Sequence, residues 1–246
     1  MRYALVLMLL ILAGCRAAPS EGETSTHTVT VNGRERSFRV YTPPGASDKA
    51  PLVVMLHGGF GSGTQAQRAY GWDGLADKEG FIVAYPDGLN RAWNAGGGCC
   101  GQPGRENLDD VAFLEQMVAG LKGIDSKRVY ATGMSNGAMM AYRLGCDSRV
   151  FAAIGPVAGT LLGECPAPAP IPVIHVHGLK DTNVRFDGEP GSGVAGIDGP
   201  PIPEVVKLWQ DHGGGKVQLV TVPEAGHEWP DGSTEKIWAF FQAISK

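Results

Sequence analysis

The chain carries a serine in a setting that would make it a nucleophile. Ser135 lies in the pentapeptide Gly-Met-Ser-Asn-Gly at 133–137, after an apolar run over 128–132 and before a helix-forming run over 138–144. A turn this sharp from strand to helix leaves no room for side chains two residues either side of the serine, so glycine is required there. The pattern predicts that Ser135 projects its hydroxyl outward at the end of a strand.

A serine hydroxyl is a weak nucleophile near neutral pH, so it needs a base to accept its proton and a third group to orient that base. Asp181 follows a strand-like run over 171–177, and His227 follows another over 217–222. Serine, then acid, then histidine is the chain order of the α/β-hydrolase fold. Active sites of open parallel sheets lie beyond the carboxyl ends of the strands. The order and spacing therefore predict a triad of Ser135, Asp181 and His227.

The tetrahedral intermediate of ester cleavage needs hydrogen-bond donors for its oxyanion. The backbone N–H of Asn136, directly after the serine, is one candidate. A second donor is expected from the loop 57–61, which reads His-Gly-Gly-Phe-Gly and follows an apolar strand over 51–56. Glycines there let the main chain approach a ligand closely. We expect this donor at Gly59 or Phe60, and the sequence does not choose between them.

Three aromatic residues lie in loops expected at the same edge of the sheet. Trp93, Trp229 and Phe60 could stack against an aromatic acid or a sugar ring. The alternative is that they only pack their own loops. For Trp93 and Trp229 the two interpretations have equal weight, and we expect both residues to contact substrate. For Phe60, packing of its own loop has the greater weight.

Other polar residues are expected to be structural. His175 and His177 lie on one side of a strand, but no third ligand is placed beside them, so we expect no metal site and no cofactor. Asp109 and Asp110 suit the N-terminus of a helix. Asp187 is a reserve candidate for the triad acid, should its loop fold back toward the histidine.

The chain as a whole alternates strands and helices, which predicts a mostly parallel sheet. Asn-Gly at 32–33 favours a tight hairpin, Asn107 is the expected N-cap of a helix, and the proline- and glycine-rich segment 184–203 suits a surface loop. The expected strands are 28–31, 37–41, 51–56, 81–85, 128–132, 151–157, 173–176 and 217–222, and the expected helices are 65–78, 107–121, 138–144, 204–212 and 233–243. We expect an α/β-hydrolase fold with a twisted sheet of about eight strands, helices on both faces and little or no cap domain.

Length and composition suit one catalytic domain. The chain has 246 residues, of which 43% are hydrophobic, enough to bury a full core. Its formal net charge is −4 and it has no cluster of lysine and arginine, which argues against nucleic acid as a partner. A neutral ester suits this charge balance better, and we expect a monomer.

The N-terminus has the features of an export signal. Arg2 precedes an almost wholly apolar run over 3–13, which is too short to span a bilayer as a mature helix. Residues 1–14 are therefore expected to form a signal peptide.

Leu-Ala-Gly-Cys at 12–15 resembles the lipobox of bacterial lipoproteins. This predicts acylation of Cys15, which would anchor the protein in the bacterial cell envelope, a tether over 15–26 and a catalytic domain over 27–246. Membrane contact would then occur only through the lipid. The alternative is cleavage near residues 17–18 and release of a secreted protein.

Export makes disulfides possible among the cysteines that follow the lipobox. These are Cys99, Cys100, Cys146 and Cys165. A bond between the adjacent Cys99 and Cys100 would strain the backbone, so each is expected to bond to a different partner among Cys146 and Cys165. Both such pairings stay open, and either would hold the glycine-rich loop 96–98 against the helix after the serine.

Several segments together resemble the polyhydroxybutyrate depolymerase and feruloyl esterase family. They are Leu-His-Gly-Gly at 56–59, Trp-Asn at 93–94 with Gly-Cys-Cys-Gly at 98–101, Asp-Asp-Val-Ala-Phe at 109–113, the pentapeptide at 133–137, His-Gly-Leu-Lys-Asp at 177–181 and Gly-His-Glu-Trp-Pro at 226–230. The resemblance implies a secreted α/β-hydrolase that cleaves carboxylic esters, with Ser135 as nucleophile, Asp181 as acid and His227 as base. Many members carry Cys-Thr-Gln after the His-Gly, where this chain has Gly-Phe-Gly at 59–61.

These expectations combine into an exported serine ester hydrolase that works through an acyl-enzyme. Feruloyl or acetyl esters of polysaccharides and hydroxyalkanoate oligomers are the expected substrates. Two alternatives stay open: a serine peptidase of the same fold, since the same triad cleaves amides, and a non-catalytic surface-binding protein.

Overall fold

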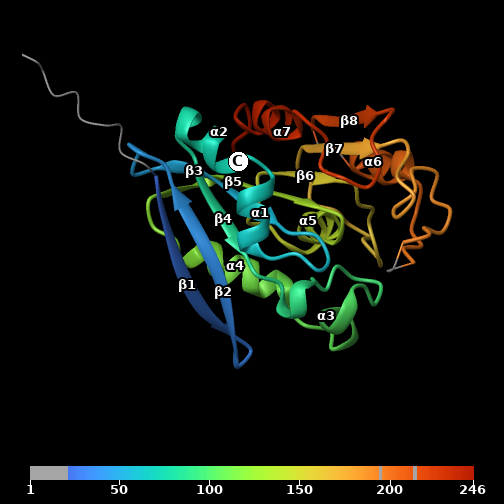
Figure 1. Cartoon of the computed structure of the whole chain (residues 1–246), viewed down its shortest axis with the longest axis horizontal. Coiled ribbons are helices and arrows are strands. Elements are labelled where there is room, and N and C mark those ends of the chain that lie inside the picture. The colour runs from blue at the N-terminus through green and yellow to red at the C-terminus, as the bar shows by residue number, and fades with distance from the viewer. Residues whose placement is uncertain (1–21, 194–195, 213–214) are drawn as a thin grey trace, which may run out of the picture.

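One eight-stranded sheet forms the centre of the protein (Figure 1). The computed structural model describes residues 22–193, 196–212 and 215–246. The strands are β1 (Glu23–Val31), β2 (Arg34–Thr42), β3 (Ala50–Leu56), β4 (Ile82–Pro86), β5 (Ile124–Met134), β6 (Ala153–Val157), β7 (Val173–Gly178) and β8 (Val217–Val222). The helices are α1 (Gly63–Ala69), α2 (Trp72–Glu79), the short 3₁₀ helix η1 (Leu89–Arg91), α3 (Gly101–Arg105), α4 (Asp110–Gly120), α5 (Asn136–Asp147), α6 (Ile202–Asp211) and α7 (Ser233–Phe241).

The strand order is β1-β2-β4-β3-β5-β6-β7-β8. Only the pairs β1–β2 and β2–β4 are antiparallel, and the rest of the sheet is parallel. The β1–β2 hairpin turns at Asn32 and Gly33, whose φ values of 50° and 76° are those of the tight turn that suits a hairpin. The predicted α/β-hydrolase fold with about eight strands is confirmed.

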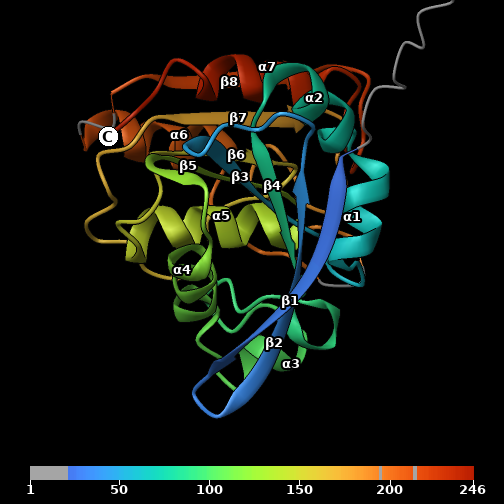
Figure 2. The same ribbon diagram turned by 90° about the vertical axis from the view of Figure 1, so that its left-hand side faces the viewer.

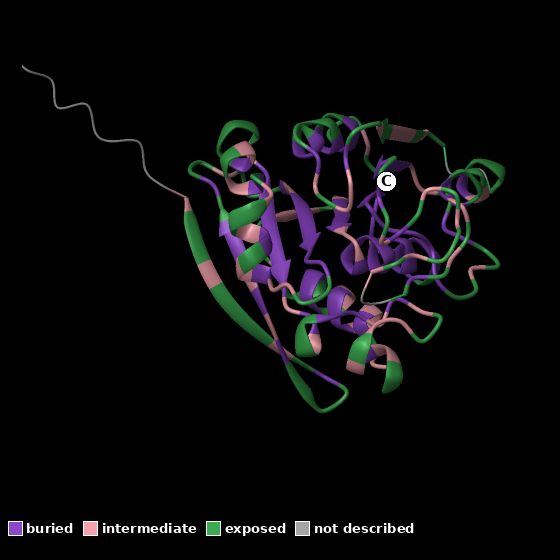
Figure 3. Ribbon diagram, turned by 45° about the vertical axis from the view of Figure 1, so that its right-hand side comes forward, coloured by how far each residue is buried: buried purple, intermediate pink, exposed green. Residues whose placement is uncertain are grey.

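Helices cover both faces of the sheet (Figure 2). Phe113 of α4 and Trp209 of α6 belong to the core on one face, with α5 between them, and Trp72 of α2 and Phe241 of α7 belong to the core on the other. The central strands are buried almost throughout (Figure 3). Burial on both faces explains why these strands read as continuous apolar runs rather than as alternating patterns.

Two helix boundaries differ from the prediction. The helix expected over 65–78 is broken at Gly71, whose φ of 71° is left-handed, so that α1 and α2 are separate. The helix expected from Asn107 starts later, because the side chain of Asp109 is its N-cap and accepts a hydrogen bond from the Ala112 N–H at 2.9 Å. Asn107 instead has a left-handed φ of 47° in the preceding turn.

The start of the catalytic domain also differs from the prediction. β1 begins at Glu23, which pairs with Thr42, so residues 23–26 belong to the sheet rather than to a tether. The proposed signal peptide and Cys15 lie outside the described residues. Within the described ranges, none of the helices has the length and apolar character needed to cross a membrane.

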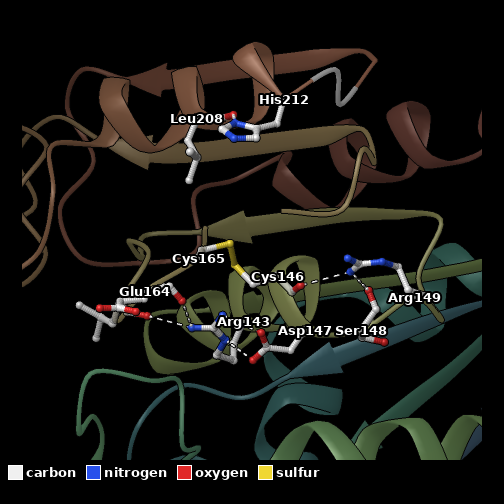
Figure 4. Close-up of a disulfide and its surroundings, with 10 residues drawn as sticks. Arg143, Cys146, Asp147, Ser148, Arg149, Glu164, Cys165, Leu208 and His212 are labelled. Carbon is white, nitrogen blue, oxygen red and sulfur yellow. Dashed lines mark hydrogen bonds and ion pairs between the residues drawn. A yellow bond between two sulfur atoms is a disulfide. The ribbon is translucent and has the colours of Figure 1, made fainter. Parts of the chain in front are cut away.

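One disulfide ties the end of α5 to the segment after β6. Cys146 and Cys165 are bonded with an S–S distance of 2.03 Å and Cα atoms 5.6 Å apart (Figure 4). Beside them, Arg143 donates a hydrogen bond to the Glu164 carbonyl at 2.9 Å. The fold thus brings Cys146 and Cys165 together from elements that already contact each other.

The predicted cysteine pairing is wrong for the other two cysteines. Cys99 and Cys100 are bonded to each other and are joined by a cis peptide bond. Since Cys146 and Cys165 pair with each other, neither is free to reach these two residues. The loop 96–98 is held by close backbone packing instead: a Cβ on Gly97 would lie 3.0 Å from the Gly163 nitrogen.

A buried ion pair joins β2 to α4 and to the loop before α3. Arg36 Nη2 lies 2.6 Å from Asp110 Oδ1, and both side chains are almost fully buried. Asp110 Oδ2 also accepts the Asn94 N–H at 2.7 Å, and the guanidinium lies 4.1 Å from the centre of the Phe113 ring. Burial raises the pKa of Asp110, and Arg36 opposes this shift. Asp110 therefore does more than complement a helix N-terminus.

We predict that Asp110→Ala lowers the free energy of unfolding by about 3 to 5 kcal/mol, because it leaves the Arg36 charge buried and unpaired. Glu106→Ala is the matched control. Glu106 pairs with Arg34, which lies in β2 like Arg36, but both side chains of this pair are exposed. Its expected cost is at most about 1 kcal/mol. Urea unfolding measures both costs, and equal costs would contradict the role given to the buried pair.

Candidate active site

Ser135 occupies a strained turn between β5 and α5. Its φ and ψ are 56° and −118°, a conformation that is rare for a residue with a side chain. A Cβ on Gly133 would lie 2.6 Å from the Gly137 carbonyl, and one on Gly137 would lie 2.3 Å from the Leu56 carbonyl oxygen. Both glycines are therefore sterically required, as the pentapeptide predicts.

The structure brings Ser135, His227 and Asp181 into one hydrogen-bonded chain. His227 Nε2 lies 2.8 Å from Ser135 Oγ, and His227 Nδ1 lies 2.8 Å from Asp181 Oδ2. The three residues come from loops after β5, β8 and β7. A proton on Nδ1, donated to the carboxylate, leaves Nε2 free to accept the serine proton.

The Asp181 carboxylate is held by its own loop. Oδ1 accepts the N–H groups of Asn183 at 2.8 Å and Val184 at 2.9 Å. Burial favours the neutral acid, but the hydrogen bonds from His227 and from these amides outweigh it and lower the pKa of Asp181. The reserve candidate Asp187 is instead paired with Arg185 on the surface.

The two candidate oxyanion donors in the 57–61 loop are distinguished by the structure. The N–H of Phe60, whose φ is 64°, donates to the Arg91 carbonyl at 2.8 Å, so the prediction of a Phe60 donor is wrong. Gly59 lies beside the start of α5, since a Cβ there would be 3.9 Å from the Asn136 Cβ. The backbone N–H groups of Gly59 and Asn136 are therefore the candidate pair.

His57 anchors this loop, a role that the sequence reasoning missed. Its Nδ1 lies 2.7 Å from the Gly58 carbonyl, to which it donates, and Nε2 accepts the Gly88 N–H at 2.9 Å. Burial lowers the pKa of His57, so the ring stays neutral with this one tautomer. The sequence signal for this role was the position of the histidine, directly after an apolar strand and before two glycines. A histidine there can hydrogen-bond the backbone of the glycine-rich loop that it begins.

The position of Trp93 contradicts the expectation that its ring is open to a substrate. It is fully buried, and its indole N–H donates to the His57 carbonyl at 2.9 Å. The Asn136 side chain binds both the N–H of Trp93, at 2.7 Å, and its carbonyl, at 3.1 Å. Trp93 thus packs behind the serine turn and supports it.

Trp229 also packs rather than lining the pocket beside the serine. Its ring stacks on Tyr70 with centroids 4.7 Å apart, and its N–H donates to Thr234 Oγ1 at 3.0 Å. Both tryptophans therefore follow the alternative of packing their own loops. Of the three aromatic residues, Phe60 is the one whose side chain is free to contact a substrate, because it is 69% exposed.

A pocket of about 490 Å³ opens beside the serine. Ser135 and His227 line it together with Phe60 and Arg91, and apolar side chains such as Met139 and Ile197 form much of the remaining wall. This size and apolar character suit a small organic ester.

A second buried chain of hydrogen bonds lies behind Asp181. Tyr142 Oη lies 2.6 Å from His175 Nδ1, His175 Nε2 lies 2.9 Å from His177 Nδ1, and His177 Nε2 lies 2.8 Å from the Val184 carbonyl. The carbonyl only accepts, so one direction satisfies every atom: Tyr142 donates to His175, which donates to His177, which donates to Val184. The two histidines are therefore neutral supports of the 181–184 turn.

We predict that this chain makes stability depend on pH. Burial lowers the pKa of His175 well below 6.5, so below that pH the unfolded chain binds a proton that the folded chain does not. The free energy of unfolding should therefore fall with falling pH, by up to about 1.4 kcal/mol per pH unit for each such proton. His175→Gln should flatten this slope in urea unfolding at pH 7.5, 6.5 and 5.5.

His212→Gln is the control, because His212 is exposed at the end of α6. It should leave the slope unchanged. Equal slopes for the wild type and His175→Gln would contradict the neutral state assigned to His175.

Comparison with known proteins finds named esterases among the relatives of this chain. The bifunctional acetylxylan esterase/xylanase XynS20E of Neocallimastix patriciarum is 32% identical over 161 residues, which cover 63% of this chain and 22% of that protein. Feruloyl esterase C of Emericella nidulans is 30% identical over 189 residues, which cover 71% of this chain and 64% of that protein. The chain thus spans less than two thirds of the length of either relative.

Solved structures share the fold. The acetyl xylan esterase from Aspergillus awamori matches with a TM-score of 0.64 at 18% identity, covering 89% of this chain and 99% of that one. Residues 36–185, which include Ser135 and Asp181, match the sequence profile of the family described as esterase PHB depolymerase. Since this match covers more than half of the sequence, the chain belongs to the esterase PHB depolymerase family.

Proposed function

We propose that the protein is a serine carboxylic-ester hydrolase. The observation that carries the proposal is the continuous hydrogen-bond chain from Ser135 through His227 to Asp181, with 2.8 Å at each step. Ser135 and His227 line a pocket whose volume suits a small organic ester. Membership of an esterase family supports it, as do relatives named acetylxylan esterase and feruloyl esterase.

In the first half of the reaction, Ser135 Oγ attacks the ester carbonyl while His227 Nε2 accepts its proton. The N–H groups of Gly59 and Asn136 stabilise the oxyanion of the tetrahedral intermediate. His227 then protonates the departing alcohol, which leaves an acyl group on Ser135. Asp181 keeps the imidazole in the useful tautomer and stabilises its charged form.

In the second half, water replaces the alcohol. His227 takes a proton from the water, which attacks the acyl-enzyme through the same oxyanion site, and Ser135 leaves with a proton from His227. The net reaction converts ester and water to acid and alcohol. Because Asp181 has a lowered pKa, it stays ionised through the cycle.

Feruloyl or acetyl esters of polysaccharides and hydroxyalkanoate oligomers are the substrates we propose. The pocket of about 490 Å³ holds a small acyl group with part of its alcohol, and the exposed Phe60 offers a ring for stacking. Comparing kcat/KM for methyl ferulate, acetylated xylan, hydroxybutyrate oligomers and 4-nitrophenyl acetate ranks these classes, since specificity lies in that ratio.

We predict that Ser135→Ala and His227→Ala lower kcat on 4-nitrophenyl acetate at least about 10³-fold, and Asp181→Asn roughly 10³- to 10⁴-fold. Asp187→Asn is the matched control, because Asp187 lies on the same loop but pairs with Arg185 at the surface. It should keep activity near that of the wild type. A well-folded Ser135→Ala protein with near-normal kcat would contradict the mechanism.

We also propose that the chain is exported and acylated at Cys15. The N-terminal sequence supports this, and two disulfides within the described residues suit an oxidising compartment.

We predict that Cys15→Ser moves the protein from the membrane fraction of a bacterial host to the soluble fraction and abolishes labelling by a fatty-acid analogue. An unlabelled, soluble wild type would contradict the lipid anchor.

A further inference from the structure

The pocket beside Ser135 carries a cation at its rim. Its wall contains apolar side chains and the amide side chains of Asn90 and Asn183, and Arg91 is the permanently charged residue among its lining. The nearest carboxylate of the catalytic apparatus, Asp181, is buried behind His227 and already bonded. The pocket therefore offers a positive charge without an acid facing it.

Backbone contacts hold Arg91 beside the oxyanion loop. Asn90 and Arg91 both have left-handed φ values, 47° and 63°, although neither is glycine. The Arg91 N–H donates to the Gly88 carbonyl at 3.0 Å, and its own carbonyl accepts the Phe60 N–H at 2.8 Å. Such a conformation persists only where the surroundings hold it. Arg91 is thus locked to the loop that presents the candidate oxyanion donor Gly59.

The side chain of Arg91 has spare donors. Its Nε–H donates to the Gly61 carbonyl at 3.3 Å, which lays the guanidinium along the oxyanion loop. Among the described residues its terminal nitrogens have no acidic partner within 4.0 Å, and Asp87, an acid near this loop, is occupied by Gly63 and Ser37. A guanidinium with free N–H groups is matched by a carboxylate, which accepts two parallel hydrogen bonds.

We propose that Arg91 binds a free carboxylate of the substrate, so that the enzyme prefers esters that bear a second, ionised acid group. The proposal rests on the proposed ester hydrolysis and names the substrate class for the same pocket. The chain's net charge of −4 opposes approach of an anion from a distance, but contact at the rim is governed by the local guanidinium.

Matched substrate pairs test the proposal on the full protein. 4-Acetoxybenzoate and 4-acetoxybenzamide place the acid or its neutral amide on the alcohol side, and monoethyl adipate and the ethyl ester of adipamic acid place it on the acyl side. We predict that the wild type prefers the acid in at least one pair by about tenfold in kcat/KM, as a charge-assisted hydrogen-bond pair supports. The preference should shrink in 1 M salt.

Arg91→Gln should remove the acid preference, and Arg91→Lys should keep part of it. The ratio of acid to amide is the measure, because loss of the Arg91 contact with Gly61 would lower turnover of both members of a pair alike. Arg68→Gln is the control, since it removes the same charge from the exposed side of α1 and should leave the ratio unchanged.

An equal ratio in the wild type and Arg91→Gln would overturn the proposal, as would a wild type without acid preference in either pair. These results differ from failure of the proposed function, in which the wild type would also leave 4-nitrophenyl acetate uncleaved.

Discussion

The close packing of two backbone segments sets the geometry of the site. Where α5 begins, the Gly137 backbone passes so near to the end of β3 that a single added carbon would lie 2.3 Å from the Leu56 carbonyl oxygen and 2.6 Å from that of His57. This contact places the turn that carries Ser135 against the loop that carries Gly59. Ser135 and the candidate oxyanion donors are therefore positioned by the same contact, and neither can shift alone.

Neutral buried histidines hold the loops on either side of that contact. His57 ties the Gly58 backbone to Gly88, and His177 ties the Val184 carbonyl to the core through His175. Burial keeps these rings uncharged, so each has one donor and one acceptor in a fixed direction. Directional hydrogen bonds from a rigid sheet suit a site that must keep a charged carboxylate and an imidazole aligned.

The sheet and the meeting of Ser135, Asp181 and His227 could be predicted because they follow from local rules. Glycines two residues either side of Ser135 report a steric need, and Asp181 and His227 each follow a recognisable strand, so parallel strand ends bring them together. What could not be predicted depends on partners distant in the sequence. The Phe60 N–H is taken up by the Arg91 carbonyl, and the backbone of Trp93 is held by the Asn136 side chain, 43 residues further along the chain.

The cysteines and Asp110 illustrate the same limit. The prediction excluded a bond between the adjacent Cys99 and Cys100 on a local argument. The observed pairing depends instead on the contact between α5, which carries Cys146, and the segment that carries Cys165. Asp110 follows a helix N-cap in sequence, yet its main partner is Arg36, 74 residues away in a neighbouring strand. Such contacts belong to the tertiary structure, and a short pattern contains no signal for them.

Covalent labelling by a fluorophosphonate, followed by peptide mass spectrometry, tests the central claim most directly. Such a probe reacts with a serine hydroxyl only when a base activates it. The account predicts one adduct, on the peptide that contains Ser135, and its loss when His227 is replaced by alanine in a folded protein. Labelling that persists at Ser135 without the imidazole, or an adduct on another residue alone, would contradict the account.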